Sequence, residues 1–138
     1  MDYINRTLVV EDNKELREII STYLDIYKLD YDLAEDGKFA LEKSEERSKQ
    51  NIFYRTILTD LEMPNLDGLD LIKELKKRVE GRKILKPQIY VLTGGHKNIE
   101  EVFSLKEKGN VSEVFKKPYE ISKAVIELRK FYDSLIDQ

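Results

Sequence analysis

The stretch Thr56-Ile57-Leu58-Thr59-Asp60 joins a run of apolar and β-branched residues to a carboxylate. A short run of this kind is typical of a buried strand. Similar runs occur at residues 7–10, 31–34, 88–92 and 112–115, the second of them being weaker. The chain therefore contains five candidate strands, and the stretch that ends in Asp60 is the third.

The longer segments between these runs carry apolar residues at helical spacing. The clearest pattern covers residues 121–135, where an apolar stripe indicates an amphipathic helix with one face on the core. The segment after the second strand differs, because Phe39, Ala40 and Leu41 are followed by an entirely polar run, residues 42–50. We therefore expect the second helix to be short, frayed or displaced.

The alternation of strand and helix along the chain predicts an α/β fold. Neighbouring parallel strands need a crossover connection, and helical crossovers place helices on both faces of the sheet. A length of 138 residues corresponds to one domain. We expect residues 1–138 to form a single domain built on a five-stranded parallel sheet, with no separate output domain.

The composition excludes several classes of function. A net charge of −3 does not favour nucleic acid as a partner. The chain has no cysteine and one histidine, His96, which excludes disulfides, cysteine nucleophiles and metal sites built from thiolates or several histidines. Residues 1–6 lack the apolar run of a secretory signal, and no apolar run is long enough to cross a bilayer. We expect a cytoplasmic protein without a membrane partner.

Reactive side chains follow four of the five predicted strands. Glu11 and Asp12 follow the first strand, Asp60 the third, Thr93 ends the fourth, and Lys117 follows the fifth. Ligands of open α/β sheets bind at the carboxyl ends of strands. Each residue alone has a simpler explanation, since the acids and Thr93 could cap helices or turns and Lys117 could be solvated. The set as a whole favours one joint site.

Three carboxylates brought together in a crevice would repel one another, so this site needs protons or a cation. With oxygen ligands and few carboxylates, Mg²⁺ that keeps several waters fits better than zinc or calcium. A lysine and a threonine hydroxyl beside the metal could hold an anion such as a phosphoryl group. Aspartate can accept a phosphoryl group to form an acyl phosphate, and Asp60 on the central strand is the candidate nucleophile.

These residues also stand in motifs that resemble the receiver domains of two-component response regulators. Val9-Val10-Glu11-Asp12-Asn13 is similar to the acidic opening motif, and Leu58–Gly68, with its D-x-x-M-P-x-x-D-G run, is similar to the phosphoacceptor motif. Leu92-Thr93-Gly94 resembles the motif of the switch hydroxyl, and Lys117-Pro118 resembles the lysine-proline ending. The resemblance covers the whole chain and implies a flavodoxin-like sheet with strand order 2-1-3-4-5.

The resemblance also implies the role of each residue. Asp60 would accept a phosphoryl group from a histidine kinase or a histidine phosphotransfer protein and so switch a protein-binding surface. Asp12, Asp60 and the main-chain carbonyl of Glu62 would bind Mg²⁺, with Glu11 acting through water. Thr93 and Lys117 would hold the phosphoryl oxygens. Such a protein is a signalling phosphoacceptor that catalyses only its own phosphorylation and dephosphorylation, and the Lys117-Pro118 bond would be cis.

One departure from the family pattern leaves alternatives open. Most receiver domains carry Tyr or Phe three residues before the matching lysine, where this chain has Val114. Phe115 is adjacent, but strand alternation directs it to the opposite face. Val114 favours an alternative, a pseudo-receiver that binds partners constitutively. A third hypothesis, an aspartate-nucleophile phosphohydrolase, requires a second aspartate where this chain has Glu62, and a cap domain for which the chain has no room.

Overall fold

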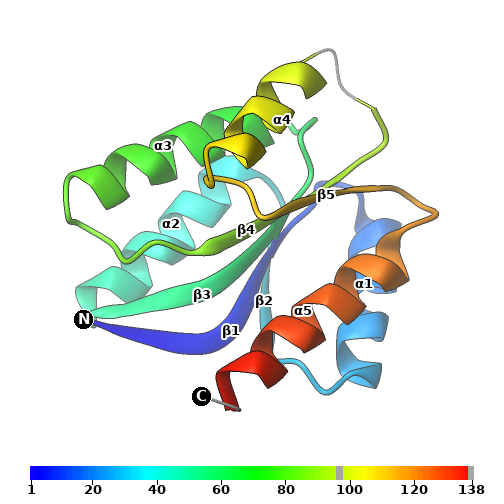
Figure 1. Ribbon diagram of the computed structural model, residues 1–138, viewed down its shortest axis with the longest axis horizontal. Coiled ribbons are helices and arrows are strands. Elements are labelled where there is room, and N and C mark those ends of the chain that lie inside the picture. Colours follow the sequence, from blue (N-terminus) through cyan, green and yellow to red (C-terminus); the bar gives the residue numbers. More distant parts are fainter. Residues whose placement is uncertain (96–97, 137–138) are drawn as a thin grey trace.

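The computed structural model describes residues 1–95 and 98–136, so His96 lies outside the described residues. Strands and helices alternate along the chain (Figure 1). The elements are β1 (Asp2–Val10), α1 (Lys14–Ile26), β2 (Tyr31–Ala34), α2 (Gly37–Lys49), β3 (Ile52–Thr59), α3 (Gly68–Glu80), β4 (Gln88–Thr93), α4 (Ile99–Glu107), β5 (Glu113–Lys116) and α5 (Ile121–Ile136). None of the described helices has both the length and the apolar character needed to span a bilayer.

The five strands form one parallel sheet in the order β2-β1-β3-β4-β5, which confirms the predicted α/β architecture. Helices α1 and α5 cover one face, and α2, α3 and α4 cover the other (Figure 1). The register places Val10, the last residue of β1, beside Thr59 of β3 and Ala34 of β2. The residues that follow β1 and β3 therefore leave the sheet at the same level.

Each face of the sheet has its own hydrophobic core, because successive side chains of a strand point to opposite faces. In β1, Leu8 and Val10 pack on the side of α2, α3 and α4, whereas Val9 packs on the side of α1 and α5. In β3, Ile57 and Leu58 divide in the same way. Burial of both faces explains why these strands are continuous apolar runs in the sequence.

The apolar stripe of residues 121–135 confirms the prediction for the last helix. Ala124, Val125 and Leu128 of α5 are fully buried and join the core shared with α1. The first strand is longer than predicted and begins at Asp2. Its added residues pair with the start of β3, and the register shifts between Ile4 and Thr7.

The prediction for the second helix is wrong, because α2 is a regular helix of 13 residues. Its start is stabilised by Asp36, whose carboxylate accepts a hydrogen bond from the Phe39 N–H at 3.0 Å. Its polar second half takes part in two ion pairs. Arg47 contacts Asp32 of β2 at 2.8 Å, and Glu45 contacts Arg78 of α3 at 3.0 Å.

Charged residues of β2 and α3 therefore lie opposite the polar half of α2. Arg47 and Lys49 also lie in the last turn of α2, where positive side chains favour the helix dipole. These contacts join residues far apart in the sequence, so the apolar pattern of α2 alone did not indicate them.

Candidate functional site

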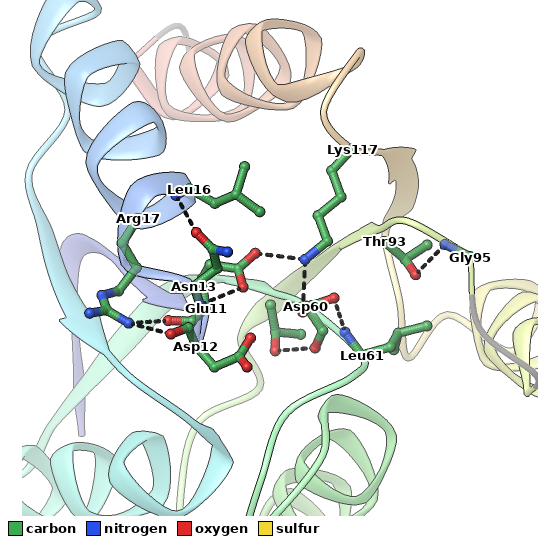
Figure 2. A network of polar contacts seen from close by, with 11 residues as sticks. Glu11, Asp12, Asn13, Leu16, Arg17, Asp60, Leu61, Thr93, Gly95 and Lys117 are labelled. Atoms are coloured by element: carbon green, nitrogen blue, oxygen red, sulfur yellow. Dashed lines mark hydrogen bonds and ion pairs between the residues drawn. The ribbon is translucent and has the colours of Figure 1, made fainter.

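The carboxyl edge of the sheet carries the predicted site residues (Figure 2). Glu11 directly follows β1, Asp60 directly follows β3, Thr93 is the last residue of β4, and Lys117 directly follows β5. Main-chain hydrogen bonds continue the sheet through three of these residues. The N–H groups of Glu11, Asp60 and Lys117 donate to carbonyls of the neighbouring strands at 2.9–3.1 Å. These hydrogen bonds fix the main-chain positions from which the three side chains extend.

Lys117 joins two of the acids. Its Nζ lies 2.8 Å from Glu11 Oε1 and 2.8 Å from Asp60 Oδ2. Glu11 and Asp60 are 1% and 4% exposed, so both carboxylates are buried beneath the lysine. Glu11 also accepts a hydrogen bond from the Asn13 N–H at 3.2 Å. The ammonium therefore bridges the ends of β1 and β3, reaching them from the segment after β5.

The environment raises the pKa values of both Glu11 and Lys117, but for different reasons. Burial raises the pKa of the Glu11 carboxyl; the hydrogen bond from Lys117 acts against this, and the negative charge of Asp60 adds to it. Burial alone lowers the pKa of Lys117, but its contacts with Asp60 and Glu11 outweigh burial and raise it. Lys117 therefore stays charged at neutral pH.

Asp12 completes an acidic group with Glu11 and Asp60. One carboxylate oxygen of each residue lies within 4.8 Å of the others, and Asp12 is the exposed member. Three carboxylates face one lysine, so the group carries more negative than positive charge. The donors are hard oxygens of the type that Mg²⁺ binds, and the exposed Asp12 leaves room for water ligands. The residues present therefore fit a magnesium ion.

The segment after β3 is held close to Asp60. The Leu61 N–H donates to Asp60 Oδ1 at 2.7 Å, and Thr59 Oγ1 donates to the Asp60 carbonyl oxygen at 2.8 Å. Gly68, the first residue of α3, lies so near that a Cβ there would overlap the Asp60 carbonyl oxygen. Glycine at this position allows the start of α3 to pass close to the main chain of Asp60.

Two residues at the start of α2, Asp36 and Gly37, hold the same segment and were not singled out in the sequence. Asn65 Nδ2 donates to the buried Asp36 Oδ2 at 2.7 Å, and the Gly37 N–H donates to the Leu66 carbonyl at 3.1 Å. The segment after β3 is therefore attached to the start of α2. Asp36 shows the signal of a helix N-cap in the sequence, but its contact with Asn65 spans 29 positions and has no local signature.

The remaining predicted residues lie around this centre. Thr93 is buried at the end of β4, and its hydroxyl oxygen accepts a hydrogen bond from the Gly95 N–H at 3.2 Å. Glu62 lies in the segment after β3 with its side chain exposed. The Lys117-Pro118 peptide bond is cis, as predicted. The structure thus brings Glu11, Asp12, Asp60 and Lys117 together at one edge, with Thr93 at the neighbouring strand end (Figure 2).

The comparison with protein families agrees with this geometry. A family model described as the response regulator receiver domain matches residues 7–129. The chain belongs to this family. Receiver domains of two-component response regulators are signalling phosphoacceptors, so the phosphohydrolase hypothesis has no support from the family.

Individual receiver-containing proteins are similar over shorter or longer parts of the chain. The CpxR homolog of Haemophilus influenzae, a transcriptional regulatory protein, is 31% identical over 102 residues, which are 74% of this chain and 40% of that protein. Hybrid signal transduction histidine kinase I of Dictyostelium discoideum is 40% identical over 65 residues, 47% of this chain and 4% of the kinase. The receiver domain thus corresponds to less than half the length of either relative.

Among solved structures, the receiver domain of Francisella response regulator 1452 is similar throughout. It has a TM-score of 0.74 and 25% sequence identity, and the alignment covers 96% of this chain and 99% of that one. The receiver fold therefore extends over nearly all of this chain.

Val114 and Phe115 of this receiver domain point to opposite sides of β5, as predicted. Val114 is half-buried and packs against the core beneath α2, α3 and α4, whereas Phe115 is buried in the core of α1 and α5. Val114 also lines a surface pocket of about 320 Å³ together with Thr93, Phe103 and Tyr119. The side chain that departs from the family pattern therefore lines the same pocket as Thr93.

Proposed function

We propose that Asp60 accepts a phosphoryl group from a phosphohistidine donor and that the resulting acyl phosphate switches a protein-binding surface. The observation that supports this most strongly is the contact of Lys117 Nζ with both Glu11 and Asp60, inside a group of three acids at the carboxyl edge. The group combines a candidate nucleophile, a cation and metal-binding oxygens at one edge of the sheet.

In the proposed reaction, a carboxylate oxygen of Asp60 attacks the phosphorus atom of the donor. The P–N bond to the donor imidazole breaks as the P–O bond to Asp60 forms, and the imidazole leaves with the electron pair of the broken bond. Lys117 moves from its ion pair with Asp60 to the phosphoryl oxygens. The Thr93 hydroxyl donates a hydrogen bond to another of these oxygens.

Asp12, Asp60 and the main-chain carbonyl of Glu62 would hold Mg²⁺, and Glu11 would act through a water ligand. The ion, when bound, neutralises negative charge on the transferred group. This assignment is supported by the hard oxygen donors of the acidic group and by its excess of negative charge.

Histidine kinases and histidine phosphotransfer proteins are the proposed donors. The similarity to part of a hybrid histidine kinase supports this class of partner. We further propose that residues 1–138 work as one receiver unit in the cytoplasm, without a nucleic-acid or membrane partner. The downstream target is a protein that recognises the phosphorylated surface.

Intact-mass spectrometry tests the phosphorylation directly. The protein is incubated with Mg²⁺ and acetyl phosphate, with Asp60→Asn and EDTA as controls. We expect one added phosphoryl group, absent from both controls. If neither acetyl phosphate nor a phosphorylated histidine phosphotransfer protein gives this adduct on a folded protein, the proposed phosphoacceptor function is wrong.

Val114 favours one second candidate, a pseudo-receiver that binds partners constitutively. Without an aromatic side chain at this position, the protein-binding surface would not respond to the state of Thr93. Amide chemical shifts of α4 and β5, compared before and after phosphorylation, distinguish the two hypotheses. Shifts confined to the carboxyl edge would favour the pseudo-receiver, whereas shifts that extend through α4 and β5 would favour the switch.

A further inference from the structure

Arg17 reaches from α1 back to the acidic segment that precedes the helix. Its Nη1 donates to the main-chain carbonyl oxygen of Glu11 at 2.9 Å and to that of Asp12 at 3.0 Å. Figure 2 shows the guanidinium on the α1 side of this segment, with Lys117 on the other side. One side chain thus binds two successive peptide groups of the segment that carries two of the three acids.

The main chain of Arg17 is itself fixed. Its N–H donates to the Asn13 carbonyl at 2.9 Å in the first turn of α1, and its carbonyl accepts from the Ser21 hydroxyl at 2.8 Å. The Asn13 side chain caps the same turn by accepting from the Leu16 N–H at 3.0 Å. Arg17 therefore connects the capped first turn of α1 to the main chain of Glu11 and Asp12.

Arg17 and Lys117 provide positive charge in different ways. Lys117 occupies carboxylate oxygens of Glu11 and Asp60. Over residues 1–95 and 98–136, by contrast, no ion pair joins Arg17 to a carboxylate, and its contacts here are with carbonyl oxygens. Its charge counteracts repulsion within the acidic group while the carboxylates remain available to another cation.

We propose that Arg17 is a positioning residue for the metal-binding acids. By holding both carbonyl groups, it sets the main chain of Glu11 and Asp12 so that the Asp12 carboxylate would serve as a metal ligand beside Asp60 and the Glu11 carboxylate would act through a water ligand. Residues that hydrogen-bond to metal ligands commonly set the orientation of the ligands and the affinity for the metal. This inference rests on the proposed function, because it assigns Arg17 to the same magnesium site.

Titration calorimetry with Mg²⁺ alone, in the absence of phosphoryl donor, tests the role of Arg17. Arg17→Gln keeps much of the side-chain length but loses the charge, and we expect about tenfold weaker Mg²⁺ binding. Lys14→Gln is the matched control, since it removes one positive charge from an exposed position in the same helical turn. We expect Lys14→Gln to bind within about twofold of the wild type and Arg17→Lys to recover part of the lost affinity.

Amide hydrogen exchange of the metal-free protein provides a second readout. The Asn13 N–H donates to Glu11 Oε2, so loosening of the acidic segment exposes this amide. We expect faster exchange at Asn13 in Arg17→Gln, with the free energy of unfolding in urea close to that of Lys14→Gln. A general loss of stability, with no selective change in Asn13 exchange or in Mg²⁺ affinity, would show that Arg17 has only a structural role.

The outcomes separate this inference from the function on which it rests. Wild-type protein that binds no Mg²⁺ would contradict the proposed metal site and the role of Arg17 together. Wild-type binding with an unchanged dissociation constant in Arg17→Gln would overturn only the role of Arg17. Arg17→Met, which also lacks the donors but keeps an apolar stem, replaces Arg17→Gln if that variant does not fold, and the same tenfold weakening is expected.

Discussion

Two clusters of charged side chains in this protein use carboxylates in opposite proportions. In the Asp32 cluster, one carboxylate accepts contacts from Arg6 and Arg47, each at 2.8 Å, and from the Tyr54 hydroxyl. In the Asp60 cluster, formed by Glu11, Asp12, Asp60 and Lys117, three carboxylates face one ammonium. The first has more donors than acids, and the second has more acids than donors.

The pKa shifts follow this difference in charge. Burial raises the pKa of Asp32, but hydrogen bonds from Tyr54, Arg6 and Arg47 outweigh it and lower the pKa to about 2. In the Asp60 cluster, burial and the charge of Asp60 outweigh the bond from Lys117, and the pKa of Glu11 is raised. The ionised carboxylate is thus favoured in one cluster and disfavoured in the other.

The comparison indicates which cluster is structural and which is functional. The Asp32 cluster joins β1, β2, β3 and α2 and needs no further ligand, because each carboxylate oxygen already has a donor. The Asp60 cluster is incomplete without additional positive charge. Buried groups that are left short of a counter-charge are typical of sites that bind a ligand or react.

The largest effect on stability is expected from Asp32→Ala. The substitution leaves two arginines and the buried Tyr54 hydroxyl without their acceptor, and we expect a loss of about 2–3 kcal/mol in the free energy of unfolding. Urea denaturation measures this loss. Asp30→Ala, which removes an exposed carboxylate just before β2, is the control and should change stability by less than about 0.5 kcal/mol. Equal effects of Asp32→Ala and Asp30→Ala would show that the contacts of Asp32 do not stabilise the fold.

Addition of Mg²⁺ is expected to stabilise the protein through the Asp60 cluster alone. Binding to the folded state at a concentration one hundred times the dissociation constant contributes about 2.7 kcal/mol. Thermal unfolding with and without the ion checks this in the wild type and in Asp12→Asn. We expect most of the stabilisation to be absent from Asp12→Asn, and a full response in that variant would contradict the assignment of Asp12 as a ligand.

The Asp32 cluster predicts a defined pH dependence at acidic pH. The folded pKa of about 2 lies below the ordinary value of 3.8, so the cluster stabilises the fold fully above pH 3.8. This contribution, about 2 kcal/mol, is lost as the pH falls towards 2. We expect the difference in unfolding free energy between wild type and Asp32→Asn to shrink over this interval. A constant difference between pH 5 and pH 2 would show that the charge of Asp32 does not produce the stabilisation.

The smallest effect is expected from Asp60→Asn in the absence of divalent cations. The substitution removes one of three neighbouring negative charges, and the single amide oxygen can accept a hydrogen bond from Lys117 or from the Leu61 N–H but not from both. We expect the free energy of unfolding to increase by about 1 kcal/mol, measured by urea denaturation in EDTA. A destabilised variant would mean that the ion pair with Lys117 outweighs repulsion among the acids, and the two clusters would then be alike.

The sequence predicted the parts of this protein that depend on short-range patterns. Apolar runs identified the strands, the stripe of residues 121–135 identified α5, and the acids after residues 10 and 59 identified the site edge. It failed for α2, whose polar half buries Ser44 and places Arg47 and Glu45 opposite charged residues of β2 and α3. Ion pairs between distant residues leave no periodic signal in the residues that form them.

By itself, therefore, the sequence determined the α/β class, the family and the side chains available at the carboxyl edge of the sheet. The tertiary structure decided how these side chains are paired. It placed Lys117 between Glu11 and Asp60, brought Arg17 back onto the acidic segment, and surrounded Asp32 with donors 26, 15 and 22 positions away. Such pairings depend on strand order and register, which set distances between residues that no local pattern connects.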